Sequence, residues 1–368
     1  MADINVLQTL IQFRRGTEEE WNLVKDTYIP RAGEPCTTID TESGNNHIKV
    51  GDGVNTWGKL KYIGEGDLQV VKIYGDSTES TETTVDGKTY ATVEEAIEAV
   101  PDGGTIKMSA GLGANETISA DKKFVLDMNS AVIVDNEKNP INTTINGDLT
   151  LTGNGSVACN KNGAPSVLNN GSMVIENGNY THKDEKGDTY YAVLNHGKMT
   201  INDGLFNIDG NVSSLVVNGY YDYNNKDSIK GYVEGVNQAN PEMVINDGTF
   251  ITNFLAVKND DGAKLTINNG KFYGTIKNSG VEMTINNGYF ERKWNDLDNL
   301  IFCDKFNDTV NAAKTTINGG TFIGHITSNG EMIVKGGKFD TKLLDAFIAE
   351  GYEQKLVDGW YVVSKKGE

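Results

Sequence analysis

The seven residues Thr266–Phe272, Thr-Ile-Asn-Asn-Gly-Lys-Phe, recur throughout the second half of the chain. In every copy an Ile or Val stands three residues before a Gly, and an aromatic residue stands two residues after it. Self-similarity of this kind predicts stacked units, each of which buries its apolar face against its neighbours. The other copies are Thr200–Phe206, Val244–Phe250, Thr284–Phe290 and Thr316–Phe322, with looser copies at Val174–Tyr180 and Ile333–Phe339.

The spacing of the repeat glycines predicts the size of one unit. The seven glycines are separated by 26, 44, 22, 18, 32 and 17 residues, so the shortest coil has 17–18 residues and longer intervals carry insertions. The coil from Phe272 to Gly288 contains three short strands separated by Gly-containing turns. We therefore expect a three-sided parallel β-helix with aliphatic and aromatic ladders inside and asparagine amide ladders at its corners.

The handedness of the coils is less constrained than their number of sides. Coils of 17–18 residues also suit a left-handed helix built on hexapeptides, but a strict hexapeptide repeat is absent. The irregular insertions and the helix that precedes the first coil favour a right-handed form.

Both ends of such a stack expose core and unpaired strand edges, so each end needs a cover. Thr92 and Glu95 form a capping box, and Val93, Ala96, Ile97 and Val100 follow as one apolar stripe of a helix. This stretch, with Gly104-Thr105-Ile106 after it, resembles the start of pectate-lyase-like right-handed β-helices, in which a helix covers the first coil.

The C-terminal cover is predicted as a helix and a hairpin. Leu343, Leu344, Phe347 and Ile348 fall on one face of a short helix, and Gln354–Val363 contains an Asp-Gly turn between two strands. Together with Gly337-Lys338-Phe339, this pattern resembles the endings of Asn/Gly-rich repeat proteins of gut bacteria and their phages.

The first 64 residues carry different motifs. Val6–Phe13 alternates like a strand, and Thr17 and Glu20 form a capping box for a short helix. Gln12–Thr17, Ala32–Pro35, Ile39–Thr41, Ile48–Gly53, Trp57 and Leu60–Tyr62 follow in order. These motifs resemble a small domain near the start of bacteriophage fibre proteins, namely the N-terminal domains of the phage major tropism determinant and of phage hyaluronate lyases.

That resemblance implies where the N-terminal domain lies in a virion. In those proteins the domain lies at the virion-proximal end of a homotrimer. It implies that virion attachment or trimer contacts involve basic and aromatic residues of this domain. The candidates are Phe13, Arg14, Arg15, Trp21 and Trp57.

The predicted fold class is mainly all-β, a small N-terminal β-rich domain followed by a single-stranded right-handed parallel β-helix with helical caps. The expected divisions are a virion-attachment domain (1–64), a linker (65–84), the β-helix with loop insertions (85–339) and a C-terminal cap (340–368). The apolar island Leu68–Tyr74 in the linker is either one strand or a segment that packs on neighbouring subunits.

The composition of the chain narrows the range of its possible binding partners. A formal net charge of −18 argues against nucleic acid and against an anionic membrane. Cys36, Cys159 and Cys303 are too far apart for a disulfide framework or a metal site, so we expect three buried thiols. Met1–Gln12 lacks the basic start and apolar run of a secretory signal, so we expect assembly in the host cytoplasm.

Enzymatic chemistry has no clear signature. Glycoside hydrolysis needs two carboxylates about 5–10 Å apart, and the loop pairs Asp184/Asp188, Asp222/Asp227 and Asp296/Asp298 do not stand out from other loop acids. Pectate-lyase and polygalacturonase signatures are missing, and the four histidines form no ligand pair. We therefore expect no catalytic residues, no metal and no cofactor.

The insertions are better suited to binding. They interrupt the repeats at Thr181–Tyr190, Tyr220–Pro241 and Glu291–Lys314, and we expect them to leave one corner of the coil and build a shared surface. Their aromatic side chains could stack on sugars, or could instead anchor the loops. The candidate ligand-binding residues are Tyr221, Tyr223, Tyr232, Arg292, Trp294 and Asp296.

Together these patterns predict a structural fibre or spike subunit of a phage virion, on tail or head, that contacts capsid or tail proteins and a host-surface glycan. The main alternative is a depolymerase that cleaves host capsular polysaccharide. A bacterial adhesin is disfavoured by the missing secretion signal.

Overall fold

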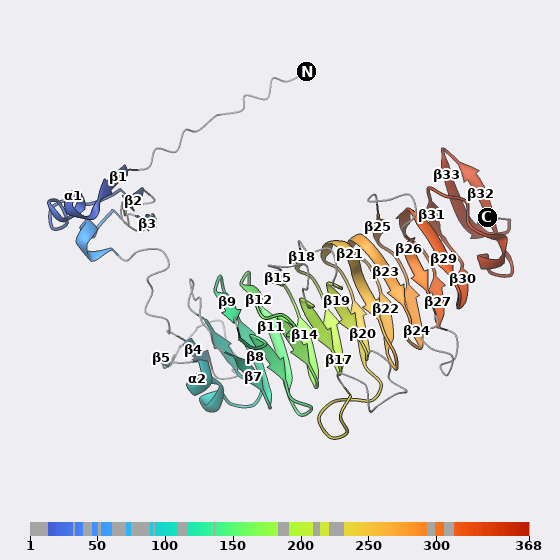
Figure 1. Ribbon diagram of the computed structural model, residues 1–368, viewed down its shortest axis with the longest axis horizontal. Coiled ribbons are helices and arrows are strands. Elements are labelled where there is room, and N and C mark those ends of the chain that lie inside the picture. The colour runs from blue at the N-terminus through green and yellow to red at the C-terminus, as the bar shows by residue number, and fades with distance from the viewer. Residues whose placement is uncertain are drawn as a thin grey trace, which may run out of the picture. The chain divides into compact units, whose positions relative to one another are not determined.

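The computed structural model shows two compact units, Met1–Asp67 and Leu68–Glu368, and each is described by itself (Figure 1). The structure describes residues 14–31, 34–39, 46–50, 53–60, 71–74, 89–90, 93–108, 117–135, 137–182, 191–208, 214–220, 232–292, 299–304 and 313–367. No helix in this part of the chain has the length and hydropathy of a membrane span.

The N-terminal unit is a three-stranded sheet with a short helix. Strand β1 (Arg14–Thr17) pairs parallel with β2 (Pro35–Ile39), which pairs antiparallel with β3 (Asn46–Val50). Helix α1 (Glu18–Asn22) begins with the predicted capping box, because Thr17 and Glu20 each bond the other's backbone N–H. A 3₁₀ turn, η1 (Trp57–Lys59), completes the unit. The predicted strand Val6–Phe13 lies outside the described residues.

Two tryptophans form the core of this small unit. The rings of Trp21 and Trp57 are stacked, with centroids 4.9 Å apart and planes 4° apart. The Lys49 ammonium lies 3.9 Å from the Trp57 ring centroid and donates to the Trp57 carbonyl. Cys36 is fully buried beside them. A core of this size relies on the cation–π contact as well as on apolar burial.

The second unit is a stack of coils whose strands line up in three columns of parallel strands, so the predicted three-sided parallel β-helix is confirmed (Figure 1). We name its three columns of parallel strands ladder A, ladder B and ladder C. The right-handed form of the coils stays a prediction.

Ladder A holds the start of each repeat and is one continuous parallel sheet. Its strands are β6 (Thr105–Lys107), β8 (Lys123–Asp127), β11 (Asp148–Thr152), β14 (Ser172–Ile175), β17 (Lys198–Ile201), β20 (Glu242–Ile245), β22 (Lys264–Ile267), β24 (Glu282–Ile285), β27 (Lys314–Ile317) and β30 (Glu331–Val334).

Ladder B holds the aromatic position of each repeat. Its strands are β9 (Val132–Asp135), β12 (Ser156–Cys159), β15 (Asn179–His182), β18 (Leu205–Ile208), the first parts of β21 (Thr249–Asn259) and β23 (Lys271–Asn278), then β25 (Tyr289–Glu291), β28 (Thr321–Ile323) and β31 (Gly337–Phe339).

Ladder C is the third side. Its strands are β7 (Ile118–Ala120), β10 (Ile141–Thr143), β13 (Val167–Asn169), β16 (Val193–Asn195), β19 (Val216–Asn218), the ends of β21 and β23, then β26 (Asn299–Cys303) and β29 (His325–Ser328). Strands β21 and β23 run unbroken through the corner between ladders B and C, which joins the two ladders as one sheet.

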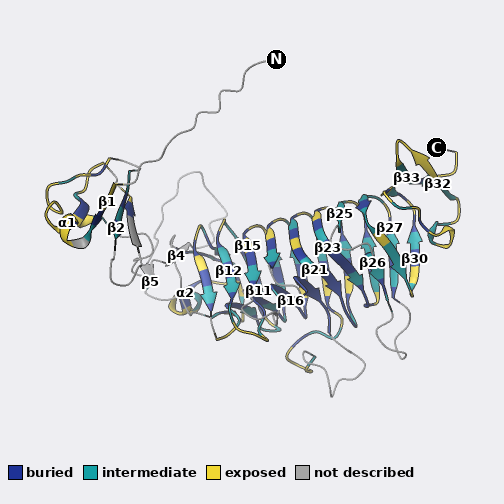
Figure 2. Ribbon diagram, turned by 45° about the horizontal axis from the view of Figure 1, so that its top comes forward, coloured by how far each residue is buried: buried dark blue, intermediate teal, exposed yellow. Residues whose placement is uncertain are grey.

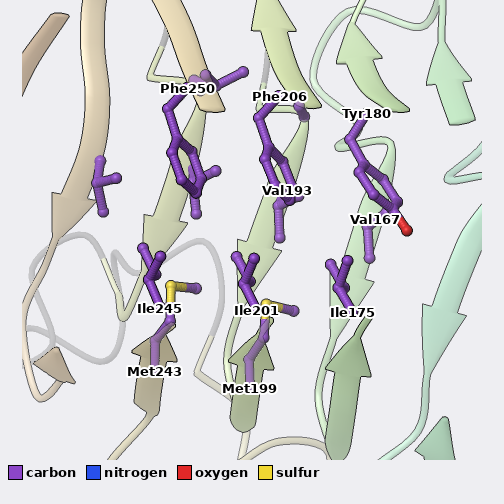
Figure 3. Packing of buried hydrophobic residues seen from close by; sticks show 14 of the residues in the cluster. Val167, Ile175, Tyr180, Val193, Met199, Ile201, Phe206, Met243, Ile245 and Phe250 are labelled. Atoms are coloured by element: carbon purple, nitrogen blue, oxygen red, sulfur yellow. The ribbon is translucent and has the colours of Figure 1, made fainter. Parts of the chain in front are cut away.

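The repeat aromatics form the predicted ladder inside the stack (Figure 3). Neighbouring rings are 4.6–5.0 Å apart and stacked. The repeat glycine precedes each ring with positive φ, +132° at Gly270, where a Cβ would lie 2.9 Å from the Phe272 ring. Only glycine therefore satisfies both the backbone and the ring at this corner. The rings are Tyr180, Phe206, Phe250, Phe272, Phe290, Phe322 and Phe339.

The predicted asparagine ladder is confirmed, and the structure contains two of them. The first runs along the outside of the corner between ladders A and B, with amide-to-amide bonds of 2.7–2.8 Å through Asn202, Asn246, Asn268, Asn286 and Asn318. The second is fully buried at the end of ladder C, with bonds of 2.5–3.0 Å. Its ladder C members are Thr143, Asn169, Asn195, Asn218, Asn259 and Asn278, and Asn278 donates in turn to Thr315 of ladder A.

Ladder A also carries a row of alternating charge on its outer face. Paired positions in six successive coils read Lys198, Glu242, Lys264, Glu282, Lys314 and Glu331. Opposite charges at directly paired positions stabilise a sheet, whereas like charges destabilise it. If a strand skipped its neighbour and paired with the next coil along, like charges would lie side by side. The alternating row of charges therefore favours the observed pairing of the coils.

The N-terminal end of the stack is covered as expected. Helix α2 (Val93–Ala99) buries Val93, Ala96 and Val100 against the first coil. Strand β4 (Val71–Tyr74) pairs antiparallel with β5 (Thr89–Tyr90) and with β6, so the described part of the apolar island forms a strand of this unit.

The C-terminal end differs from its prediction in one respect. The expected helix is only a 3₁₀ turn, η2 (Asp345–Phe347), and Leu344 is 64% exposed, so the predicted four-residue apolar face is wrong. A stretch this short gains too few helical hydrogen bonds to offset nucleation. The hairpin of β32 (Tyr352–Val357) and β33 (Trp360–Lys365) is confirmed (Figure 2). Strand β33 also pairs with β31 and closes ladder B.

Candidate functional site

The insertions leave the stack at two corners, so the predicted single corner is wrong. Thr181–Tyr190 and the first part of Glu291–Lys314 follow ladder B strands, whereas Tyr220–Pro241 and the last part of Glu291–Lys314 follow ladder C strands. Every connection from ladder A to ladder B is only two to four residues long. The repeat fixes that corner, so insertions border ladder C on both edges.

A groove of about 210 Å³ opens at the corner between ladders B and C. It forms where β21 and β23 pass through the corner and β21 bulges between Ile251 and Leu255. A bulge bends a strand and redirects its side chains. The groove is lined by Ile251, Thr252, Asn253, Tyr273, Gly274, Glu291 and Arg292.

Arg292 is held in place at one end of the groove. Its Nη1 donates to the Phe254 carbonyl at 2.8 Å and to the hydroxyl of Thr275, and its backbone N–H donates to Ile323. The floor depends on Gly274, which has φ +148° and where a Cβ would lie 2.9 Å from the Thr252 methyl group. The planar guanidinium is therefore preorganised against a floor that no larger residue allows.

The walls of the groove combine apolar surface with a carboxylate. Ile251 in the lining is 39% exposed, and the neighbouring Phe254 is 37% exposed. The ring of Tyr273 in the lining lies 6.0 Å from the ring of Tyr289, which borders the groove. The Tyr289 hydroxyl donates to Glu291 at 2.5 Å, and this bond raises the pKa of Tyr289 to about 12. Half-buried tyrosine rings at the surface can stack on a sugar ring, and fixed polar groups beside them can bond its hydroxyls.

Tyr232 lies at the other corner and packs against the coil. Its ring meets Tyr220 edge-on at 5.5 Å, and Tyr220 is fully buried and stacked on His196 at 4.4 Å. The Tyr220 hydroxyl donates to the Gln238 carbonyl at 2.5 Å. This geometry fits the anchoring alternative for Tyr232 better than a ligand contact.

Burial lowers the pKa of His196 to about 4, from about 6.5 in an unfolded chain. The unfolded chain therefore binds a proton between these values while the folded chain does not, so stability falls as the pH drops from 6.5 to 4. The predicted loss from His196 is about 3 kcal/mol. His196→Phe keeps the ring against Tyr220 and should lose less between pH 7 and 4.5 in urea unfolding. Equal losses in both proteins would contradict this assignment.

Of the six predicted ligand residues, the structure places Arg292 and Tyr232, at different corners. Tyr221, Tyr223, Trp294 and Asp296 lie outside the described residues, as do the acid pairs Asp184/Asp188, Asp222/Asp227 and Asp296/Asp298. Sequence reasoning missed the other groove residues. Tyr289, which borders the groove, had a usable signal, because it stands directly before a repeat phenylalanine and must point outward.

The predicted attachment residues differ in exposure. The side chains of Trp21 and Trp57 are only 6% and 4% exposed. Their direct contact with another protein stays a prediction. Arg14 pairs with Glu34 at 2.6 Å, and a hydrogen bond from the Arg31 backbone lowers the pKa of that carboxyl. The Arg15 side chain is exposed, and Phe13 lies outside the described residues.

The three cysteines are free and buried, as predicted, and burial raises the pKa of each thiol. Within the described ranges, no group of three or more His, Cys, Asp or Glu side chains could hold a metal ion.

Comparison with known proteins identifies one part of the chain. Residues 11–55 match the family described as the major tropism determinant N-terminal domain. This stretch belongs to the N-terminal unit, and the long parallel-strand stack follows it. No curated protein and no solved structure matches the chain.

Proposed function

We propose that the chain is a receptor-binding subunit of a phage virion, built as a fibre or spike and attached through its N-terminal unit. The match of residues 11–55 to a tropism-determinant domain, ahead of a long stack, carries this proposal. A subunit of this kind resides in the virion, on the head or the tail, and contacts the capsid or tail proteins there.

The β-helix suits a rigid shaft. Its core is continuous from Val93 to Val363, and each coil is tied to the next by backbone pairing and amide ladders. Each unit contacts only its neighbours, so the length of the stack sets the reach of the shaft. We include a homotrimer in the proposal. Sedimentation of the purified protein should give three times the 40.0 kDa mass of one chain.

We place the host contact at the groove beside Arg292, and its ligand is a surface glycan. A groove of about 210 Å³ is smaller than the roughly 300–1,000 Å³ of sites for drug-sized ligands, which fits one sugar ring. Tyr273 would stack on the apolar face of that ring, and Glu291 and Arg292 would bond its hydroxyls.

Tyr273→Ala should weaken glycan binding by about tenfold, the loss typical when a contact residue worth about 1.4 kcal/mol is truncated. Leu205→Ala is the matched control, because Leu205 also points outward from ladder B and is 40% exposed, but does not line the groove. Glycan-array binding followed by titration of the best ligand measures both variants.

Binding by the Tyr273→Ala variant tests the groove, and a cleavage assay on host capsular polysaccharide tests the alternative function as an enzyme. Equal binding by the Tyr273→Ala variant would remove the groove from the proposal. Reproducible shortening of host capsular polysaccharide, lost in Asp222→Ala or Asp296→Ala, would instead show a depolymerase. Our proposal is a non-catalytic adhesion protein, so it expects glycan chains of unchanged length.

A further inference from the structure

We propose that the groove holds one end of a neutral oligosaccharide, and that the ligand extends along β23 to a second contact at Lys277 and Phe302. This inference rests on the proposed glycan-binding function. It adds the length and charge of the ligand and a second set of contact residues.

The second contact lies on the outer face of ladder C. Lys277 is paired in register with Phe302, and its ammonium lies 5.6 Å from the centroid of that ring. Asp304 lies 4.0 Å from the same ammonium. All three side chains are half-buried and reach the surface. An aromatic ring on the outside of the coil does not contribute to the core, so its placement calls for another role.

The two contacts lie on one strand. Tyr273 and Lys277 both belong to β23, four residues apart on the two sides of the corner between ladders B and C, so they are closer than the about 13 Å that four residues span in a straight strand. The groove alone fits one ring, so a ligand that touches both contacts has to be an oligosaccharide. Arg292 bonds Thr275, which lies between the two contacts, and this bond orients the guanidinium toward the middle of the path.

The charges favour a neutral ligand. Each end of the path carries one basic and one acidic side chain, Arg292 with Glu291 and Lys277 with Asp304. In the neighbouring coil, Lys258 is 8% exposed and its ammonium pairs with the Asp260 carboxylate at 2.5 Å, so this positive charge is also balanced by a negative one. An anionic glycan would approach a chain of net charge −18 without a surplus of positive charge to receive it.

The test is a length series of the neutral glycan that binds best on the array, from one sugar residue upward, titrated by calorimetry. Phe302→Ala should leave binding of the single sugar unchanged and weaken the longest oligosaccharide about tenfold. Tyr273→Ala should weaken both. Leu168→Ala, an outward ladder C residue five strands earlier, is the matched control, and circular dichroism verifies the fold of each variant.

The outcomes separate the two claims. If Phe302→Ala has the same effect on every length, or none, the extended ligand is wrong while glycan binding stands. Tighter binding of acidic than of neutral oligosaccharides of one length would overturn the charge assignment. If the unmodified protein binds no glycan, the proposed function fails, and this inference fails with it.

Discussion

Asn195→Ala should lower the free energy of unfolding by roughly 3–5 kcal/mol, because it leaves several buried polar groups without partners. The Asn195 amide donates to Asn218 at 2.7 Å and to the Glu242 carbonyl at 3.0 Å, and it accepts from Asn169 at 2.6 Å. The amides of Asn169, Asn195 and Asn218 cannot reach water, since all three side chains are fully buried. Urea unfolding followed by circular dichroism measures the change.

Asn268→Ala is the matched control. Asn268 also bonds amides in the coils before and after it, at 2.7 and 2.8 Å, but its ladder is exposed to solvent. Water replaces those bonds, so the expected loss is about 0.5–1.5 kcal/mol. Equal losses in the two variants would contradict the assignment of the buried ladder as a main source of stability.

Phe272→Ala should cost about 3–5 kcal/mol, the range for removing a fully buried aromatic side chain. The Phe272 ring lies 4.6 Å from Phe250 and 4.8 Å from Phe290, so its loss leaves a cavity inside the stack. The rings on both sides are fixed by their own coils and cannot move to fill it. The midpoint of urea unfolding should fall accordingly.

The neighbouring residue gives the control. Tyr273 points outward from the same strand, so Tyr273→Ala should change the unfolding free energy by less than about 1 kcal/mol. The two variants should therefore separate stability from binding, because only Tyr273→Ala leaves a fully stable protein that binds glycan weakly. Loss of stability in both would show that the Tyr273 ring is structural.

The repeat itself allowed much of the fold to be predicted. In the repeat, Ile267 points inward at the end of a strand, Gly270 forms a corner with positive φ, and the Phe272 ring points inward. Every copy adopts the same arrangement. The caps were predictable at the N-terminus, where the apolar stripe spans two helical turns. At the C-terminus the stripe was too short, and η2 forms instead.

The candidate site was less accessible to sequence reasoning. The groove depends on the bulge after Ile251 and on strands that continue through a corner, and neither leaves a local motif. Arg292 stood out because it is the single arginine after residue 31. Residue type alone makes Trp21 and Trp57 attachment candidates in the sequence, whereas their stacking depends on a contact between segments far apart in the chain.

The most direct test of the central claim is immunoelectron microscopy of intact virions, combined with host adsorption, using Fab fragments against residues 340–367. The account predicts that these Fab fragments decorate the surface of the virion and that Fab fragments against the groove block adsorption. Fab fragments against residues 14–60 should label only disrupted particles. Intact virions that carry no label, or labelled virions that adsorb at the normal rate with the groove covered, would contradict a virion-anchored receptor-binding role.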